Sequence, residues 1–138
     1  LPLQDFTLPV REASGKTFEG DFFCPGSLLS LDVDNSHPVG FGMPEQTAAF
    51  WNSGVLLETF IPHNVELDRR VVASYGAQDL LISGWVIGGK AIQGKPAVVD
   101  VSLGKGHVIL CGFGVQNRAQ SWGAFKLLFN AILLGCAA

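Results

Sequence analysis

The segment between residues 112 and 123 holds the side chains best suited to bind a ligand. It runs from the predicted end of a strand into the predicted start of a helix, where free backbone N–H groups favour an anion. Arg118, with Gln116 or Gln120, supplies hydrogen-bond donors for a carboxylate. Together with Trp122, these residues form the candidate binding site. The alternative is that Arg118 and the glutamines only tie this loop to neighbouring strands.

Cys111 is the candidate nucleophile, because it stands at the end of a predicted strand and before a glycine-rich turn. A nucleophile elbow of this kind needs small residues on both sides of the reactive residue, and Ile109 occupies the first of those positions. The candidate base, His107, lies four residues earlier, about 13 Å along the same strand. We therefore expect a buried core thiol and no catalytic residue in the chain. A thiol-dependent amidohydrolase that uses Cys111 is the alternative.

A metal site has one weak candidate, His63 with Glu66, whose spacing supplies two zinc ligands on a suitable scaffold. A catalytic zinc needs a third protein ligand. The next histidine, His107, begins a predicted hairpin strand that we expect to be buried. The cysteines are three in number and widely spaced, which favours neither a zinc site nor a disulfide framework. We expect no metal and no cofactor.

Two further groups of residues have a chemical and a structural interpretation. Asp32 and Asp34 share one face of a predicted strand, where they could act as an acid–base pair or simply face solvent, and we expect the second. The three tryptophans could stack on a sugar, but we expect Trp51, Trp85 and Trp122 to be core or interface anchors.

The elements that position these residues are mostly strands. Alternating hydrophobicity predicts a strand over residues 27–34, and the segment 35–38, in which Pro38 supplies a turn, ends it. Two apolar runs, 47–51 and 55–60, are separated by Asn-Ser-Gly and predict a hairpin. Residues 70–75 have a β-branched strand pattern, and the glycine-rich stretch 83–92 is a short strand or a loop.

In the C-terminal third of the chain, the residue pattern predicts a hairpin followed by a helix. Strands 97–103 and 107–111 are joined by Gly-Lys-Gly, and a helix is expected over residues 118–134, with Asn117 as N-cap and Gly135 just past its end. Large apolar residues recur at intervals of three and four along this helix, which predicts the face that packs on the core. These residues are Trp122, Phe125, Phe129, Ile132 and Leu133.

Composition excludes several classes of protein. Of the 138 residues 48% are hydrophobic and 15% are charged, and the net charge is −3. A disordered chain would have the reverse balance, and a nucleic-acid-binding protein would have clustered lysines and arginines. The apolar run 124–134 contains Lys126 and Asn130 and is too short to span a bilayer, so we expect no membrane insertion. At this length residues 1–138 are a single domain or part of one.

The sequence also resembles a known family. The segments 23–44, 81–85 and, most specifically, 104–133 are similar to the extreme C-terminal region of large bacterial proteins of the zinc carboxypeptidase family. The resemblance implies that this region follows a peptidase domain and is similar to a class I glutamine amidotransferase-like (flavodoxin-like) fold. It thus implies an α/β fold, with a β-rich mixed sheet, hairpins and a C-terminal helix. The zinc ligands would lie in the preceding domain.

The expected function is therefore that of a non-catalytic accessory domain of a zinc carboxypeptidase-like protein. Such a domain would support the peptidase, bind a substrate or mediate self-association. Its high apolar content favours self-association or packing on a peptidase domain, with no nucleic acid as partner. The second alternative, besides the Cys111 enzyme, is a ligand-binding module at the 116–123 loop. The resemblance implies a secreted or periplasmic parent protein, whereas the chain itself leaves the compartment unknown.

Overall fold

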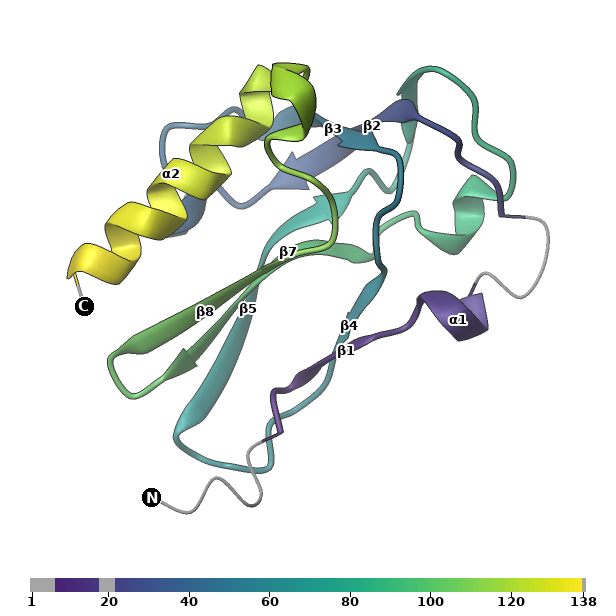
Figure 1. The fold of residues 1–138 in the computed structure, drawn as a ribbon. Coiled ribbons are helices and arrows are strands. Elements are labelled where there is room, and N and C mark those ends of the chain that lie inside the picture. The colour runs from purple at the N-terminus through teal and green to yellow at the C-terminus, as the bar shows by residue number, and fades with distance from the viewer. Residues whose placement is uncertain (1–6, 18–21, 138) are drawn as a thin grey trace.

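The computed structural model describes residues 7–17 and 22–137 and contains a β-sheet, a two-stranded ribbon and one long helix (Figure 1). Two short 3₁₀ turns, η2 (Pro38–Gly40) and η3 (Gly89–Ala91), lie between strands, and a third, η4 (Asn117–Ala119), lies between β8 and α2. The elements follow one another as β1 (Val10–Glu12), α1 (Ser14–Thr17), β2 (Ser27–Val33), η2 (Pro38–Gly40), β3 (Gln46–Trp51), β4 (Leu57–Thr59), β5 (Leu67–Tyr75), β6 (Leu81–Ser83), η3 (Gly89–Ala91), β7 (Pro96–Leu103), β8 (Gly106–Cys111), η4 (Asn117–Ala119) and α2 (Trp122–Ala137).

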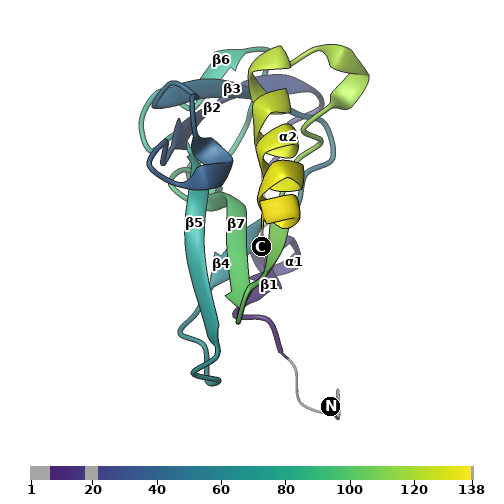
Figure 2. The same cartoon turned by 90° about the vertical axis from the view of Figure 1, so that its left-hand side faces the viewer.

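The main sheet has six strands in the order β3-β2-β5-β7-β8, and β6 also pairs with β2. The predicted α/β class, the hairpin β7–β8 and the C-terminal helix are confirmed. The predicted mixed sheet is not, because every pairing between the described strands is antiparallel. Figure 2 shows β5 and β7 continuing past the end of α2 as a long arm.

The predicted hairpin between residues 47–51 and 55–60 is wrong. β3 pairs with β2, and β4 pairs with β1 in the separate ribbon. The chain leaves the sheet at Gly54, where an added Cβ would lie 2.6 Å from the Trp51 ring and 2.7 Å from the Gly112 carbonyl. Val55 N–H then donates to the same Gly112 carbonyl at 2.8 Å. The Trp51 side chain and this loop contact therefore direct the chain away from β3.

Two apolar clusters lie on the two sides of the sheet, one under α2 and the other under the β1–β4 ribbon. The larger lies between the sheet and α2 and includes Leu29, Leu31, Tyr75 and Leu127. The smaller cluster is formed by Leu57, Leu67, Val99 and Val101, which join the β1–β4 ribbon to the other side of β5 and β7. Figure 1 shows α2 and this ribbon on opposite sides of the β5–β7–β8 strands. Alternate β7 residues thus face different layers, as the strand period of two requires.

The helix α2 begins later than predicted and turns a different face to the core. Asn117 is not its N-cap, since residues 117–119 form η4, and Gly135 lies inside the helix. Ala124 and Leu127 are the fully buried side chains, whereas most of the predicted core stripe is exposed. The reason is close packing: a Cβ on Gly123 would lie 2.5 Å from Thr47 Oγ1. Small residues let the helix approach β3, and the large ones point away from the sheet.

Candidate functional site

The predicted binding loop is on the surface. Gln116, Arg118 and Gln120 are exposed, and so is Trp122, whose indole Nε1–H donates to the Ala119 carbonyl. Arg118 and Ala119 both have left-handed backbone angles, with φ of 47° and 55°. This conformation is costly for residues other than glycine, and it turns the chain sharply between β8 and α2. The loop exposes the predicted donors to solvent.

The Cys111 thiol is half-buried at the end of β8. Burial raises the pKa of this thiol, which favours the protonated form, whereas a nucleophilic cysteine needs a lowered pKa. His107 lies on the same face of β8, but its ring is bonded to Asp100. Of the other two cysteines, Cys24 is buried and Cys136 is exposed near the end of α2. The surroundings of Cys111 therefore do not activate it.

The weak zinc candidate, His63 with Glu66, lies in the exposed turn before β5. The side chains of His63 and Glu66 face solvent, and Glu66 N–H donates to Asn64 Oδ1 at 2.9 Å. Within residues 7–17 and 22–137, no group of three or more His, Cys, Asp or Glu side chains is arranged to hold a metal ion.

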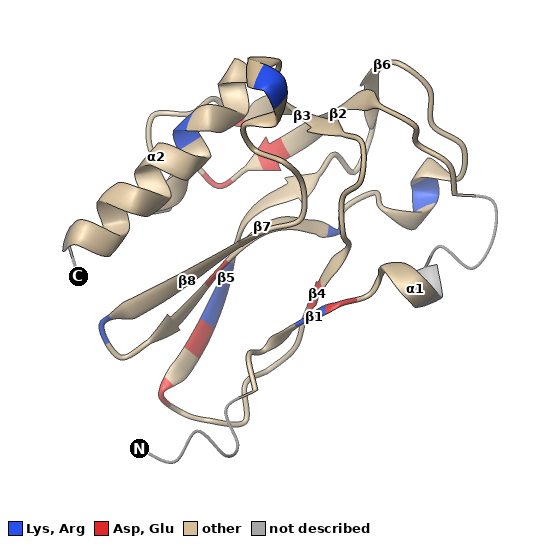
Figure 3. Cartoon of the chain, in the orientation of Figure 1, with Lys and Arg blue, Asp and Glu red and all other residues tan. Residues whose placement is uncertain are grey.

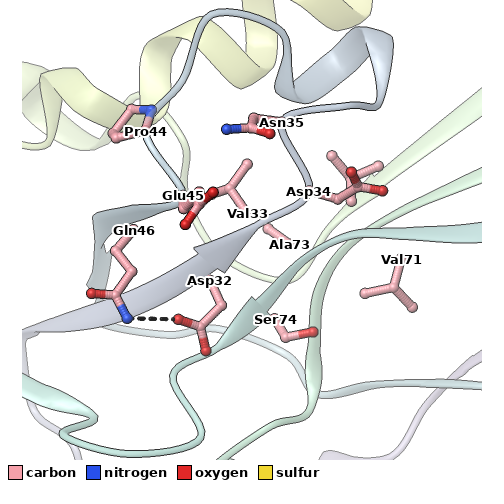
Figure 4. Close-up of a pocket in the computed structure, with 11 residues that line it drawn as sticks. Asp32, Val33, Asp34, Asn35, Pro44, Glu45, Gln46, Val71, Ala73 and Ser74 are labelled. Carbon is pink, nitrogen blue, oxygen red and sulfur yellow. Dashed lines mark hydrogen bonds between the residues drawn. The ribbon is translucent and has the colours of Figure 1, made fainter.

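Asp32 and Asp34 line one open groove at the end of β2, shown in Figure 4. They do not pair with each other. Asp32 accepts from Gln46 Nε2 at 3.1 Å, and Asp34 accepts from Arg70 Nη2 at 2.7 Å. A hydrogen bond from Ser36, together with Arg70, lowers the pKa of Asp34. Each carboxylate thus has its own donors, which fits a polar strand face better than an acid–base pair.

A buried polar cluster, which the sequence did not indicate, links three separate segments. The Asp100 carboxylate in β7 lies 3.1 Å from His37 Nε2, just before η2, and 2.9 Å from His107 Nδ1 in β8. The side chains of His37 and Asp100 are 6% and 5% exposed, and that of His107 is 25% exposed. These histidines are 70 residues apart in sequence, so no local spacing pattern connects them.

The proton positions on His37 follow from its two neighbours. Val39 N–H donates to His37 Nδ1 at 3.2 Å, so this nitrogen is an acceptor and carries no proton. Nε2 therefore carries the proton and donates it to Asp100. Burial lowers the pKa of His37, the Arg70 charge lowers it further, and Asp100 acts in the opposite direction. His37 is held as a neutral imidazole.

This His37–Asp100–His107 cluster positions the loop that supports α2. From the helix, Asn130 Nδ2 donates to the carbonyls of Val39 and Phe41, at 2.9 and 3.0 Å. Lys126 Nζ donates to the Gly42 carbonyl at 2.9 Å. The loop 37–42 is thus bonded to the β7–β8 hairpin on one side and to α2 on the other. The cluster therefore lies in a chain of hydrogen bonds that connects the sheet to the helix.

The outer face of α2, defined by Trp122, Phe125, Phe129, Ile132 and Leu133, carries four exposed large apolar side chains, and Phe125 is half-buried. Trp122 is 77% exposed, Phe129 58% and Leu133 65%. Figure 3 shows the helix almost free of charge; Lys126 is its one charged residue. No helix in the described residues is long and apolar enough to cross a membrane.

The other two tryptophans differ in environment. Trp51 is a core residue, as expected, and its ring lies 5.2 Å from that of Tyr75 in an edge-to-face contact. Trp85 is exposed and pairs edge-to-face with Phe23, with ring centres 5.9 Å apart. This pair is distant in sequence from α2 and is a second place where large apolar side chains are exposed.

Comparison with known proteins gives one structural similarity. No protein-family model matches the sequence, and no curated protein matches it. Among solved structures, the chain is similar to a ThuA-like protein from Bacteroides uniformis ATCC 8492, with a TM-score of 0.44 and 18% sequence identity. The match covers 86% of this chain and 49% of the other, so the chain spans about half the length of that protein.

Proposed function

We propose that this chain is a non-catalytic accessory domain of a zinc carboxypeptidase-like protein, and that it works by making an interface through α2. The observation that carries the proposal is the outer face of α2, where four large apolar side chains are more than half exposed. The proposal also holds that the chain is part of a class I glutamine amidotransferase-like domain. The sheet with a helix packed on one side supports that fold at the level of its α/β class.

The physical argument concerns a helix that is apolar on both sides. A surface helix of a monomer normally turns charged and polar residues to solvent, and one that is apolar all round is buried. Fully burying a leucine- or phenylalanine-sized side chain stabilises a protein by about 1.5–3 kcal/mol. Covering Trp122, Phe129 and Leu133 with another protein surface is therefore strongly favourable.

The polar groups support a role without catalysis. The carboxylates of Asp32, Asp34 and Asp100 are each bonded to protein donors, and burial holds the Cys111 thiol in its protonated form. In the resembling proteins, the peptidase residues lie in the domain that precedes this region. The chain would then contribute binding surface while a neighbouring domain performs the chemistry.

Two measurements test this function. The coding sequence upstream of Leu1 is expected to encode a zinc carboxypeptidase domain. The purified chain, incubated with a peptide that has a free C-terminal carboxylate, is expected to release no amino acid with or without added zinc. An unrelated upstream sequence, or hydrolysis by this chain alone, would contradict the proposal.

A further inference from the structure

The exposed apolar residues of α2 have the spacing of a helix–helix seam. Trp122, Phe125, Phe129, Ile132 and Cys136 follow one another at intervals of three, four, three and four residues. This alternation is the a/d pattern of two helices packed side by side, in which each side chain inserts between residues of the facing helix. The opposite side of α2 already contacts the sheet through Ala124 and Leu127. The pattern on the outer face therefore fits a second helix.

We propose that this second helix is α2 of another copy of the chain, packed antiparallel about a twofold axis at Phe129. The inference rests on the proposed function in one respect, namely that the outer face of α2 is an interface. It adds that the partner at this interface is a second copy of the chain. Phe129 lies midway between Trp122 and Cys136, so a twofold axis there places these two ends against each other. The two copies then use the same surface, as symmetric dimers do.

The available area is what a small dimer needs. Phe41, at the end of η2, is 73% exposed and lies beside Leu133 along one shallow groove. Aromatic side chains bury 150–250 Å² each, so Phe41, Trp122 and Phe129, with Ile132 and Leu133, offer roughly 600 Å² per copy. Two copies would bury about 1,200 Å², the lower limit for specific interfaces.

Charge favours the antiparallel arrangement. Lys126 is the charged residue nearest the seam, and its Nζ is held at the edge by the Gly42 carbonyl at 2.9 Å. In an antiparallel pair centred on Phe129, the two Lys126 residues are about 9 Å apart along the axis, whereas a parallel pair places them at the same level. The antiparallel pair thus separates like charges, and it leaves Lys126 at the solvated rim of the seam.

Disulfide cross-linking tests the geometry directly. In a chain that also carries Cys136→Ser, Phe129→Cys places two thiols next to the proposed axis, and diamide is expected to link most of the protein into covalent dimers. Trp122→Cys in the same background is the matched control. Its two copies lie about 21 Å apart, too far for a disulfide, and are expected to stay unlinked. Both positions are exposed, so neither change removes a core contact.

The other outcomes decide between this inference and the proposed function. Equal cross-linking at both positions would show a parallel pair and overturn the antiparallel arrangement. A third outcome is that neither position cross-links and the chain is monomeric, but the chain binds anilinonaphthalene sulfonate more strongly than its Phe129→Asp variant. This outcome would overturn self-pairing and leave the face available to another domain. A dimer that Phe129→Asp does not dissociate would overturn both.

Discussion

His37 Nε2 and the Asp100 carboxylate lie 3.1 Å apart in the interior, although 63 residues separate them in the sequence. The other ring nitrogen of His37 accepts the Val39 N–H, so an imidazolium, which has two N–H donors, does not fit this position. Since the same loop bonds to α2 through Asn130, the state of one histidine bears on how the helix is held. The buried cluster is thus structural, and it supports the surface that we assign to binding.

Replacing the shared acceptor should destabilise the fold. Asp100→Ala leaves the buried Nε2–H of His37 without an acceptor and removes the partner of the more exposed His107 ring, and we expect a loss of about 3 kcal/mol in the free energy of unfolding. Asp100→Asn keeps one acceptor oxygen and should cost less. Urea denaturation followed by circular dichroism measures both. The control is Asp68→Ala, at an exposed position of β5, which is expected to change stability by about 0.5 kcal/mol or less. Equal losses at positions 68 and 100 would contradict the cluster's role.

Acid should destabilise the protein through His37. Because the folded state lowers the pKa of His37, the unfolded chain takes up a proton more readily, near pH 6.5. Stability is therefore complete above that pH and is lost as the pH falls from about 6.5 through the lower folded pKa. Asp34, whose pKa is also lowered in the folded state, contributes only in a more acidic range, below about pH 4.

The measurement is the unfolding free energy at pH 7.5 and pH 5. His37→Gln should be less stable at pH 7.5 but should show a smaller loss on acidification than the wild type. His63→Gln, at an exposed position, should keep the wild-type pH dependence. If His37→Gln retained the full acid-induced loss, another group would be responsible.

The orientation of α2 can be tested with two leucines of the same helix. Leu127 is buried and Leu133 is 65% exposed. In a Phe129→Asp background, which removes any pairing between copies, Leu127→Ala should cost about 2–5 kcal/mol and Leu133→Ala less than about 0.5 kcal/mol. Thermal and urea unfolding give both values. A larger loss at Leu133 would mean that the predicted stripe faces the core after all.

Cysteine reactivity should follow burial. Burial raises the pKa of Cys111, so its thiol should react slowly with iodoacetamide at pH 7.5 and become reactive only in denaturant. Cys136, which is exposed, should react quickly under the same conditions and serves as the internal reference. Mass spectrometry of the labelled peptides distinguishes the two sites. Rapid labelling of Cys111 in the native protein would revive the thiol-enzyme alternative.

The sequence predicted the elements whose patterns are local. The strand over 27–34, the hairpin β7–β8 and the existence of the C-terminal helix all follow from alternation, turn residues or helical spacing. The false hairpin at 52–54 shows the limit, because its turn signal is real but Trp51 and the Gly112 carbonyl redirect the chain. Pairing partners depend on such distant contacts, which no window of sequence contains.

The helix shows a second limit. Size and hydrophobicity made the Trp122–Leu133 stripe the expected core face, but the sheet accepts the smaller Ala124 side, because Gly123 lets α2 approach β3. When both faces of a helix are apolar, the spacing of its residues does not show which face packs on the sheet. The buried cluster was missed for another reason, since His37, Asp100 and His107 come together only through the pairing of β7 with β8 and the path of the 34–42 loop.

The central claim, that the outer face of α2 is an interface between copies, is tested most directly by the mass of the protein in solution. Light scattering on the eluting peak, over a series of loading concentrations, should give twice the chain mass for the wild type and a single chain mass for Phe129→Asp. Ile82→Asp, an exposed apolar position in β6, should remain a dimer. A wild-type chain that stays monomeric at high concentration would contradict the claim.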